Sequence, residues 1–306
     1  MSAAREEHAQ AIFAPAPARR TGPRALGHRL ARNRMSLSGA AILAALILAA
    51  IFVPLLSHAD PAATDLPNRF MPPAWMARGA MAHPLGTDSL GRDVLIRVIY
   101  GGRISLTVGF VAALIAIAVG VPLGMLAGYA GGAADAAIMR FADIQLGFPP
   151  ILLYISALTV IRPNLSKIIV ILGIAGWVIY ARLIRAQVLV QRRTEYVEAA
   201  RALGASHLRI VCVHLLPNVL APIIVVASFS IATFILTASS LSFLGLGLPP
   251  STPDWGLMIA EGVKSIRIAW WPSTFAGIAV SLTVFGVNVL GDWLRDYLDP
   301  LLRMQS

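Results

Sequence analysis

The chain contains six long apolar runs, and these constrain its fold more than any other feature. Residues 37–56 carry no charged side chain. Because an α-helix rises about 1.5 Å per residue, roughly 20 apolar residues cross a hydrocarbon core of about 30 Å. The sequence therefore predicts an all-α membrane protein with about six transmembrane helices. The five further runs lie at residues 104–126, 136–161, 168–186, 219–244 and 272–290.

The composition agrees with a surface that faces lipid. Only 13% of the 306 residues are charged, whereas soluble domains carry roughly 25%. A hydrophobic content of 57% also excludes a disordered chain. The chain has one cysteine, Cys212, so no intrachain disulfide can form. These observations exclude a conventional soluble enzyme.

The net charge of +10 fits either a nucleic-acid partner or a membrane topology. Arginines gather before the first apolar run, after the fourth and after the sixth. The positive-inside rule then places both termini in the cytoplasm. No aromatic residue interleaves with the arginines of residues 19–34, as a single-strand binding surface would need, so we expect no nucleic-acid partner. A cleaved signal peptide is disfavoured because residues 37–56 exceed an h-region and more spans follow.

The third apolar run contains residues that are unusual in a membrane. Arg140 and Asp143 fall in its first turns, where they can snorkel or pair with each other at i and i+3. A polar contact that lines a pathway is the alternative. Pro149 and Pro150 predict a bend or an interruption of the helix.

Four glycines recur every fourth residue at the end of the second run. This spacing is typical of small-residue packing between membrane helices. A phosphate-binding loop is excluded because no Gly-Lys-Ser or Gly-Lys-Thr follows, here or elsewhere in the chain. If ATP powers this protein, another subunit binds it. The glycines are Gly120, Gly124, Gly128 and Gly132.

The long segment at residues 58–101, between the first two spans, is too long to be a simple connection. Asp88 or Ser89 can cap a short amphipathic helix that reaches Tyr100. His83, Asp88 and Asp93 are candidates for metal binding or acid–base chemistry. We disfavour both, because their spacing does not match convergent ligand patterns such as H-E-x-x-H.

The segment at residues 191–218 predicts a helix, a tight turn and a second helix that enters the membrane. Thr194 can cap the first helix, Gly204 can end it, and the second begins near Ser206. Ala199 and Ala200 give the first helix a small surface, which suits docking into a groove of a partner. An ordinary loop helix that packs on its own protein is the alternative.

Four stretches resemble a known family. The first resembles the EAA signature of inner-membrane permease subunits of binding-protein-dependent ABC importers, and consists of Glu198, Ala199, Ala200, Gly204, His214, Leu216 and Pro217. His214 departs from the general pattern, which has Ile there, and 214–218 resembles the dipeptide, oligopeptide and nickel subfamily. Residues 83–109, 241–250 and 291–300 resemble other sequences of that subfamily.

The resemblance implies the C-type subunit of a type I ABC importer in the bacterial inner membrane. The expected partners are a B-type permease, one or two P-loop ATPases that hold ATP and Mg, a periplasmic or lipid-anchored solute-binding protein, and membrane lipid. This chain would bind no cofactor or metal and would not be an enzyme. Di- or oligopeptides are the expected substrate, with nickel chelates, glutathione or another small solute as alternatives.

The resemblance also implies a domain organisation and a coupling site. We expect a flexible basic tail at 1–36, a first transmembrane helix at 37–57, an outer loop with a short helix at 58–101, a five-helix core at 102–292 and a C-terminal tail at 293–306. The loop at 191–218 would contact an ATPase. Its expected contact residues are Tyr196, Glu198, Ala199, Ala200, Leu203, Gly204, His214, Leu216 and Pro217.

The translocation pathway is less clear from the sequence. Many relatives carry an acidic residue before the stretch at 241–247, where this chain has Ala238, Ser239 and Ser240. The polar candidates for the pathway are Gln145, Ser239, Ser240 and Asn288, although serines often bond to their own helix. A membrane-embedded enzyme or a stand-alone transporter is a remote alternative, because the spans show neither paired catalytic groups nor matching interrupted halves.

Overall fold

The computed structural model describes residues 34–57, 59–161 and 163–298. Within these ranges the chain is helical, and its one β pairing is an isolated bridge between Thr87 and Asp93. The elements are α3 (Arg34–Leu56), the 3-10 turn η1 (Leu66–Asn68), α4 (Val94–Ala130), α5 (Gly132–Leu146), α6 (Pro150–Val160), α7 (Leu165–Ala175), α8 (Trp177–Gln191), α9 (Glu195–Ala202), α10 (His207–Arg209), the π-helical turn η2 (Ile210–Leu215), α11 (Leu216–Phe243), α12 (Trp255–Val263) and α13 (Trp271–Leu298).

Five helical segments of the described chain are long and apolar enough to cross a membrane. They are α3, α4, the α7–α8 pair, the stretch from α10 to α11, and α13. The bent pair of α5 and α6 makes a sixth crossing if it is counted as one span. The prediction of an all-α protein with about six spans is confirmed.

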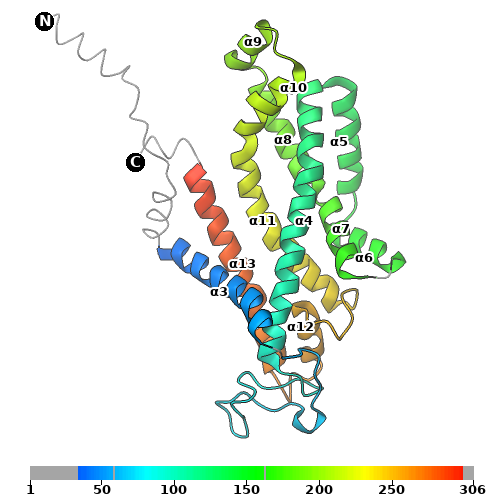
Figure 1. The fold of residues 1–306 in the computed structure, drawn as a ribbon. Helices are drawn as coiled ribbons and strands as arrows, with labels where there is room; N and C mark the ends of the chain where they lie inside the picture. Colours follow the sequence, from blue (N-terminus) through cyan, green and yellow to red (C-terminus); the bar gives the residue numbers. More distant parts are fainter. Residues whose placement is uncertain (1–33, 58, 162, 299–306) are drawn as a thin grey trace, which may run out of the picture.

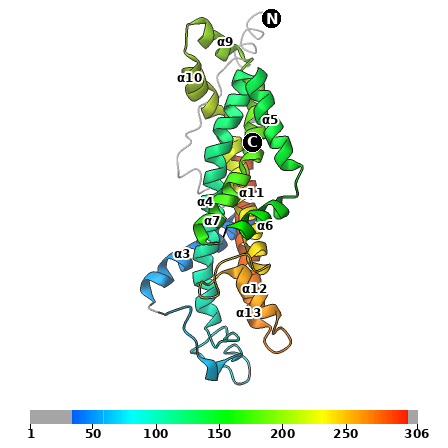
Figure 2. The ribbon, with the colours of Figure 1, turned by 90° about the vertical axis from the view of Figure 1, so that its right-hand side faces the viewer.

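Helix α4 is the axis of the bundle. Its 37 residues run from the end that carries α12 to the end that carries α5 (Figure 1). Helices α3, α7, α8 and α11 pack on it, and α8 does so most extensively. The largest buried apolar cluster lies among α4, α7, α8 and α11. Figure 2 shows α9 and the loop at 59–93 at opposite ends of the molecule, which we name the α9 end and the α12 end.

Residues 94–100 do not form the separate short helix that we expected in the outer loop. They are the first turns of α4, which continues through Gly101 and Gly102 into the second apolar run. The cap is Asp93, whose Oδ1 accepts a hydrogen bond from the amide of Ile96 at 2.9 Å. Asp88 instead closes a turn by accepting from the amide of Leu90 at 2.8 Å. Gly91, at φ 76°, keeps this stretch out of the helix.

The double proline interrupts the third span as predicted. Helix α5 ends at Leu146, and α6 starts at Pro150 with its axis turned by 85°. Proline has no amide hydrogen and its ring clashes with the preceding turn, so the two helices cannot be continuous.

Arg140 and Asp143 do not pair with each other. Asp143 accepts from Arg182 of α8, with Nη2 and Oδ1 2.5 Å apart. Asp135, about two turns earlier in α5, pairs with Arg185 of α8, with Nη2 and Oδ2 2.7 Å apart. These two carboxylates therefore hold α5 against α8. The predicted pairing of Asp143 with Arg140 at i and i+3 is wrong.

Three of the four spaced glycines bring α4 into close contact with α8. A Cβ added at Gly120 would lie 2.4 Å from the carbonyl oxygen of Trp177, and one at Gly124 would lie 2.6 Å from that of Ala181. At Gly128 the nearest atom would be Cβ of Val188 at 2.8 Å. The predicted small-residue packing is confirmed there. Gly132 differs, because it starts α5 at φ 55° with open space around it.

This contact predicts that Gly124→Val destabilises the protein. The added methyl groups have no room against α8, and overpacking of this kind costs roughly 1–3 kcal/mol. The matched control is Gly277→Val in α13, where an added Cβ meets nothing within 4 Å. Thermal unfolding in detergent, followed by size-exclusion chromatography, should show a lower midpoint for Gly124→Val alone. Equal midpoints for both variants would contradict the packing role.

Candidate coupling site and outer-end charge cluster

Helix α9 lies beyond the bundle and is anchored by one buried side chain. Val197 is fully buried and belongs to the same apolar cluster as Ile210 and Leu215 of η2. Much of the rest of α9 is open, and Tyr196 is 43% exposed. Leu203, which ends the helix, is 88% exposed. An apolar side chain left so open is available to a partner surface.

The two ends of α9 are closed by different means. Thr194 was expected to cap it, but its hydroxyl donates to the carbonyl of Gln191 at 2.6 Å and makes no cap bond. Glu195 and Glu198 lie in the first turn, where they interact favourably with the helix dipole. The expected stop at Gly204 is present, with φ 81°.

The turn after α9 is a Schellman motif. The amide of Gly204 donates to the carbonyl of Arg201, and that of Ala205 donates to Ala200, each at 3.0 Å. Ser206 then caps α10 by accepting from the amide of Arg209 at 3.3 Å. The predicted helix, turn and second helix are therefore present, and their geometry is fixed by backbone hydrogen bonds.

The remaining residues of the expected coupling site lie at the base of α9. His214 lies in the last turn of η2, while Leu216 and Pro217 begin α11. Pro217 has no amide hydrogen to donate to the preceding turn, and the helix widens to π geometry just before it. Asn218 connects this base to α9, because its Nδ2 lies 3.1 Å from the hydroxyl of Tyr196. The structure thus brings Tyr196 close to the start of α11.

Two further contacts, which the sequence did not indicate, attach this region to α4. The hydroxyl of Tyr129 lies 2.7 Å from Nδ1 of His207 in α10. Arg192 donates from Nη1 to the carbonyl of Gly128 at 2.9 Å. The patterns around Tyr129 and Arg192 do not indicate these partners, so only their spatial proximity identifies the contacts. The α9 region is consequently connected to α4, α8 and α11 together.

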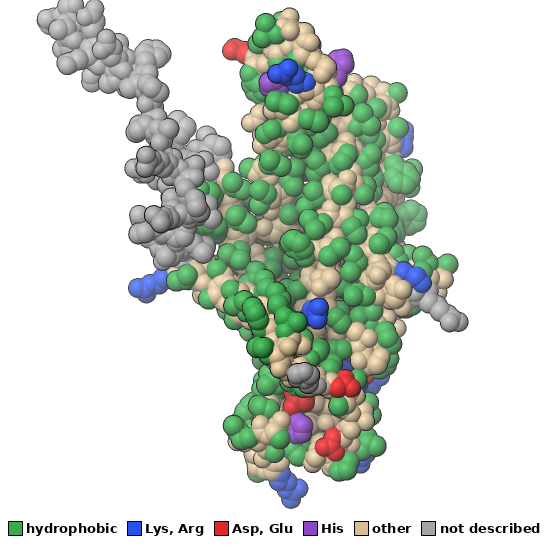
Figure 3. Space-filling view, in the orientation of Figure 1, with side chains coloured by type: hydrophobic (Ala, Val, Ile, Leu, Met, Phe, Trp, Pro, Cys, Tyr) green, Lys and Arg blue, Asp and Glu red, His purple; other side chains and the backbone are tan. Residues whose placement is uncertain are grey.

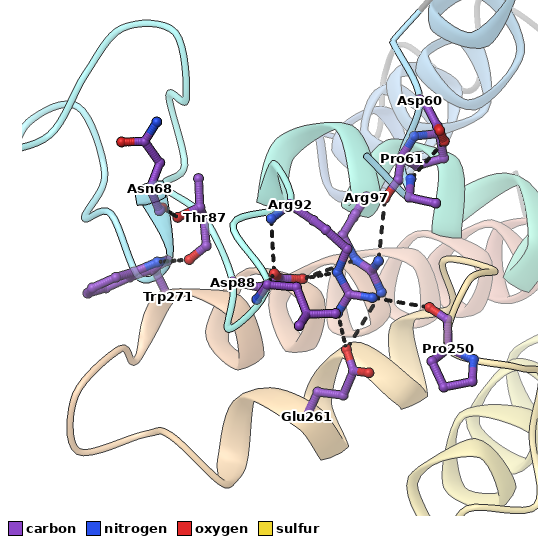
Figure 4. Close-up of polar contacts among 12 residues, drawn as sticks. Asp60, Pro61, Asn68, Thr87, Asp88, Arg92, Arg97, Pro250, Glu261 and Trp271 are labelled. Atoms are coloured by element: carbon purple, nitrogen blue, oxygen red, sulfur yellow. Dashed lines mark hydrogen bonds and ion pairs between the residues drawn. The ribbon is translucent and has the colours of Figure 1, made fainter. Parts of the chain in front are cut away.

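At the α12 end, four charged side chains form a compact cluster (Figure 4). Arg92 donates from Nε to Oδ2 of Asp88 at 2.6 Å and from Nη2 to Oε2 of Glu261 at 2.7 Å. Arg97 lies farther from the same two carboxylates, at 3.6 Å and 3.7 Å. Both arginines are at most 3% exposed. The formal charges of the four groups cancel, which reduces the cost of burying them.

The cluster joins segments that are far apart in the sequence. Arg92 also donates to the carbonyl of Pro250 at 3.2 Å, and Arg97 to that of Pro61 at 3.4 Å (Figure 4). Glu261 belongs to α12. The loop at 59–93, the start of α4, the segment before α12 and α12 itself are therefore held as one unit.

The three residues considered for metal or acid–base chemistry do not converge. His83 lies with Nδ1 2.8 Å from Oδ2 of Asp93, while Asp88 faces the arginines. No group of three or more metal-ligating side chains occurs in the part of the chain that the structure describes.

The candidate pathway residues lie in different environments. Gln145 lines a cavity of about 420 Å³ between α5–α8 and α11. Its side-chain Nε2 donates to the carbonyl of Ala175 at 2.6 Å, and its Oε1 accepts from Nε1 of Trp177 at 2.8 Å. Ser240 donates to the carbonyl of Leu236 in its own helix at 2.8 Å. Ser239 is buried, and Asn288 is half-buried on α13. Only Gln145 among these four lines that cavity.

Asp254 is a buried carboxylate that sequence reasoning missed. Its Oδ2 accepts from the amide of Leu257 at 3.2 Å and caps α12, and Ser105 and Ser242 surround it. Burial raises the pKa of the carboxyl group above its ordinary value, although these hydrogen bonds oppose the shift. Asp254 follows a proline and precedes an apolar helix, which is an N-cap signal that could have revealed it.

The raised pKa predicts a pH-dependent difference between two variants. A carboxyl group with a raised folded pKa contributes stability that declines as pH rises from its unfolded value of about 3.9 to the folded one. Asp254→Asn keeps an accepting cap without this charge, so its unfolding midpoint relative to wild type should increase with pH. Asp254→Ala should be about 1 kcal/mol less stable than Asp254→Asn at every pH, because both lack the titrating carboxyl group and only Ala lacks the cap. Thermal unfolding midpoints in detergent, measured across this pH range, test both expectations. A constant difference between the midpoints of wild type and Asp254→Asn would contradict the shifted pKa.

Comparison with known proteins agrees with this architecture. Residues 120–304 match the family described as the binding-protein-dependent transport system inner membrane component. Residues 25–73 match the N-terminal transmembrane domain of oligopeptide transport permease C. The di/tripeptide transport system permease protein DppC of Pseudomonas aeruginosa is 40% identical over 82% of this chain and 83% of its own length. The oligopeptide transport system permease protein OppC of Bacillus subtilis is 38% identical over 82% and 81%.

A solved structure supports the fold. The MetNI methionine ABC transporter in an inward-facing conformation superposes with a TM-score of 0.55 at 20% identity, covering 67% of this chain and 96% of that chain. At this identity the likeness concerns the fold alone, which is that of a type I ABC importer permease. The two family matches and the two relatives show that the chain belongs to the inner-membrane permease family of binding-protein-dependent ABC importers, in its dipeptide and oligopeptide C-type branch.

Proposed function

We propose that this chain is one of two different permease subunits of an ATP-driven peptide importer. It would pair with a B-type permease to form the translocation pathway, while one or two P-loop ATPases bind ATP and Mg and hydrolyse the nucleotide. The chain itself has no Walker A sequence, which supports a non-catalytic role. A solute-binding protein would deliver the substrate.

The observation that carries the coupling proposal is the construction of α9. Its position is set by one buried residue, Val197, and by the Schellman turn at Gly204, while Leu203 stays exposed. A short, rigid helix with exposed apolar and small side chains suits a groove on a partner. A loop helix that only packs on its own protein is the alternative, and it gives the exposed Leu203 no partner.

Movement of α9 would reach the spans through its contacts. Helix α9 packs on η2, which continues directly into α11, and α8 leads into α9. Tyr129 and Arg192 attach the same region to the end of α4. ATP binding would therefore rock these helices as a rigid group between inward and outward openings, which is coupling without catalysis by this chain.

The distribution of charge supports an orientation with the α9 end in the cytoplasm. Charged side chains gather toward the two ends of the molecule, while the flank between is mostly hydrophobic (Figure 3). Arginines are concentrated in and around α8–α10, as the positive-inside rule requires of a cytoplasmic face: Arg182, Arg185, Arg192, Arg193, Arg201 and Arg209. Both termini would then be cytoplasmic in a bacterial inner membrane, and the α12 end would meet the solute-binding protein.

Di- or oligopeptides are the substrate class that the relatives favour. The Pseudomonas aeruginosa and Bacillus subtilis proteins named above are described as di/tripeptide and oligopeptide permeases. The cavity lined by Gln145 has mixed amide and apolar walls, which suits peptides. We find no group of metal-ligating side chains in the described residues that would favour a nickel chelate instead.

Two glycines with nearly the same φ angle provide a test of α9. Gly204→Asp should abolish ATP-dependent peptide uptake and co-purification of the ATPase, because the new charge meets the partner surface. Gly245→Asp, at the α12 end, is the control: φ is 81° at Gly204 and 82° at Gly245, and an added Cβ meets nothing within 4 Å at either. Both variants should carry the same backbone penalty of roughly 1–2 kcal/mol.

The readouts are membrane level, uptake by proteoliposomes that contain all subunits, and the amount of ATPase that co-purifies. Normal uptake and ATPase recovery in Gly204→Asp would refute α9 as the coupling element. Equal loss of ATPase in Gly245→Asp would attribute the effect to backbone strain. Normal ATPase recovery with uptake of a different solute would refute only the peptide substrate.

A further inference from the structure

Arg103 is a charged residue on the membrane-spanning part of α4 for which the family function gives no role. Its side chain is exposed, and it forms no ion pair and no hydrogen bond with any other side chain in the part of the chain that the structure describes. An unpaired cation at membrane depth is costly, so it generally meets a partner or reaches the interface.

Arg103 lines an apolar groove of about 540 Å³ between α3 and the face formed by α4, α11 and α13. This volume falls within the roughly 300–1,000 Å³ typical of ligand sites. Its walls include Ile47 of α3, Phe110 of α4 and Leu290 of α13. The groove therefore has one positive charge and otherwise mostly aliphatic and aromatic walls.

The other polar side chains in the groove already have partners. The hydroxyl of Thr107 donates to the carbonyl of Arg103 in its own helix at 2.7 Å. The hydroxyl of Ser228 donates to the carbonyl of Ile224 in α11 at 3.1 Å. The guanidinium of Arg103 is thus the polar group of the groove that is left to bind a ligand, and it offers several donors in a plane.

The depth of Arg103 fits the headgroup boundary at the α12 end. Tyr100, three residues earlier, donates to the carbonyl of Ser57 at the end of α3 at 3.4 Å. Arg103 therefore lies about 4.5 Å deeper along α4, at 1.5 Å per residue. Side chains on a helix tilt toward its N-terminus, and α4 begins at the α12 end, so the guanidinium is directed back toward that interface.

The groove continues from Arg103 toward the opposite face of the membrane. Gly39 and Leu43 of α3 pack against Gly286 of α13, which closes the groove at that side. Leu290 and Leu294 extend the apolar wall from there. A ligand with a phosphate at one end and a hydrocarbon chain at the other matches this arrangement.

We propose that this groove binds an anionic phospholipid of the outer leaflet, with its phosphate on Arg103 and one acyl chain between α3 and α11. Arginine binds phosphate with two parallel hydrogen bonds, which are strengthened by charge. An anionic headgroup is favoured over a zwitterionic one because it brings no cation of its own to the guanidinium. The lipid would fill the space that α3 leaves beside the bundle.

The test is native mass spectrometry of the intact complex, reconstituted in nanodiscs of phosphatidylglycerol and phosphatidylcholine and then released. Wild type should retain phosphatidylglycerol, and Arg103→Gln should retain about tenfold less, since the charged hydrogen bonds to the phosphate are lost. The control is Arg267→Gln, an exposed arginine at the α12 end outside the groove. Thr107→Trp fills the groove one turn from Arg103 and should also reduce retention without changing the charge.

Four results would overturn the proposal. The first is equal retention by wild type and Arg103→Gln, and the second is an equal loss in Arg267→Gln. The third uses a photo-cross-linking residue in place of Phe110, which should attach to lipid. Its attachment to another permease subunit would show that protein fills the groove. The fourth is displacement of the bound lipid by inorganic phosphate alone, which would identify a site for free phosphate. None of these readouts depends on which solute is transported.

Discussion

The close contact of α4 and α8 is the constraint on which the rest of the structure depends. In a membrane, lipid tails are as apolar as side chains, so helices associate through close packing and polar contacts. Gly120, Gly124 and Gly128 let the backbone of α4 touch α8 directly. Because α8 carries Arg182 and Arg185, the same contact places α5. It also places α9, which follows α8 after a short turn.

The two ends of the molecule are held in different ways. At the α12 end, buried charges and backbone carbonyls join four segments, so that end behaves as a rigid frame. At the α9 end, a protruding helix rests on Val197 and on a few hydrogen bonds to α4 and α11. This asymmetry suits a subunit in which one end receives a mechanical input while the other keeps its shape for a docking partner.

The sequence predicts the features that arise from local periodicity or from strong helix breakers. The spans, the break at Pro149, the stop at Gly204 and the glycine packing all belong to this class. It does not predict the partner of Asp143, because i and i+3 neighbours are the only partners that spacing can suggest, whereas Arg182 lies 39 residues away. The buried environment of Asp254 depends on side chains of α4 and α11, which no linear pattern brings together. The start of α4 was misplaced because several residues near 88–93 could serve as caps.

The charge cluster at the α12 end also limits how this protein can evolve. Arg92 and Glu261 are 169 residues apart, yet each neutralises the other in a buried site. A change at either position leaves a charge that the neighbouring side chains cannot offset. Substitutions at 88, 92, 97 and 261 should therefore be accepted in compensating pairs, so the outer loop and α12 diverge together. Exchanging that loop between related permeases would then require exchanging α12 with it.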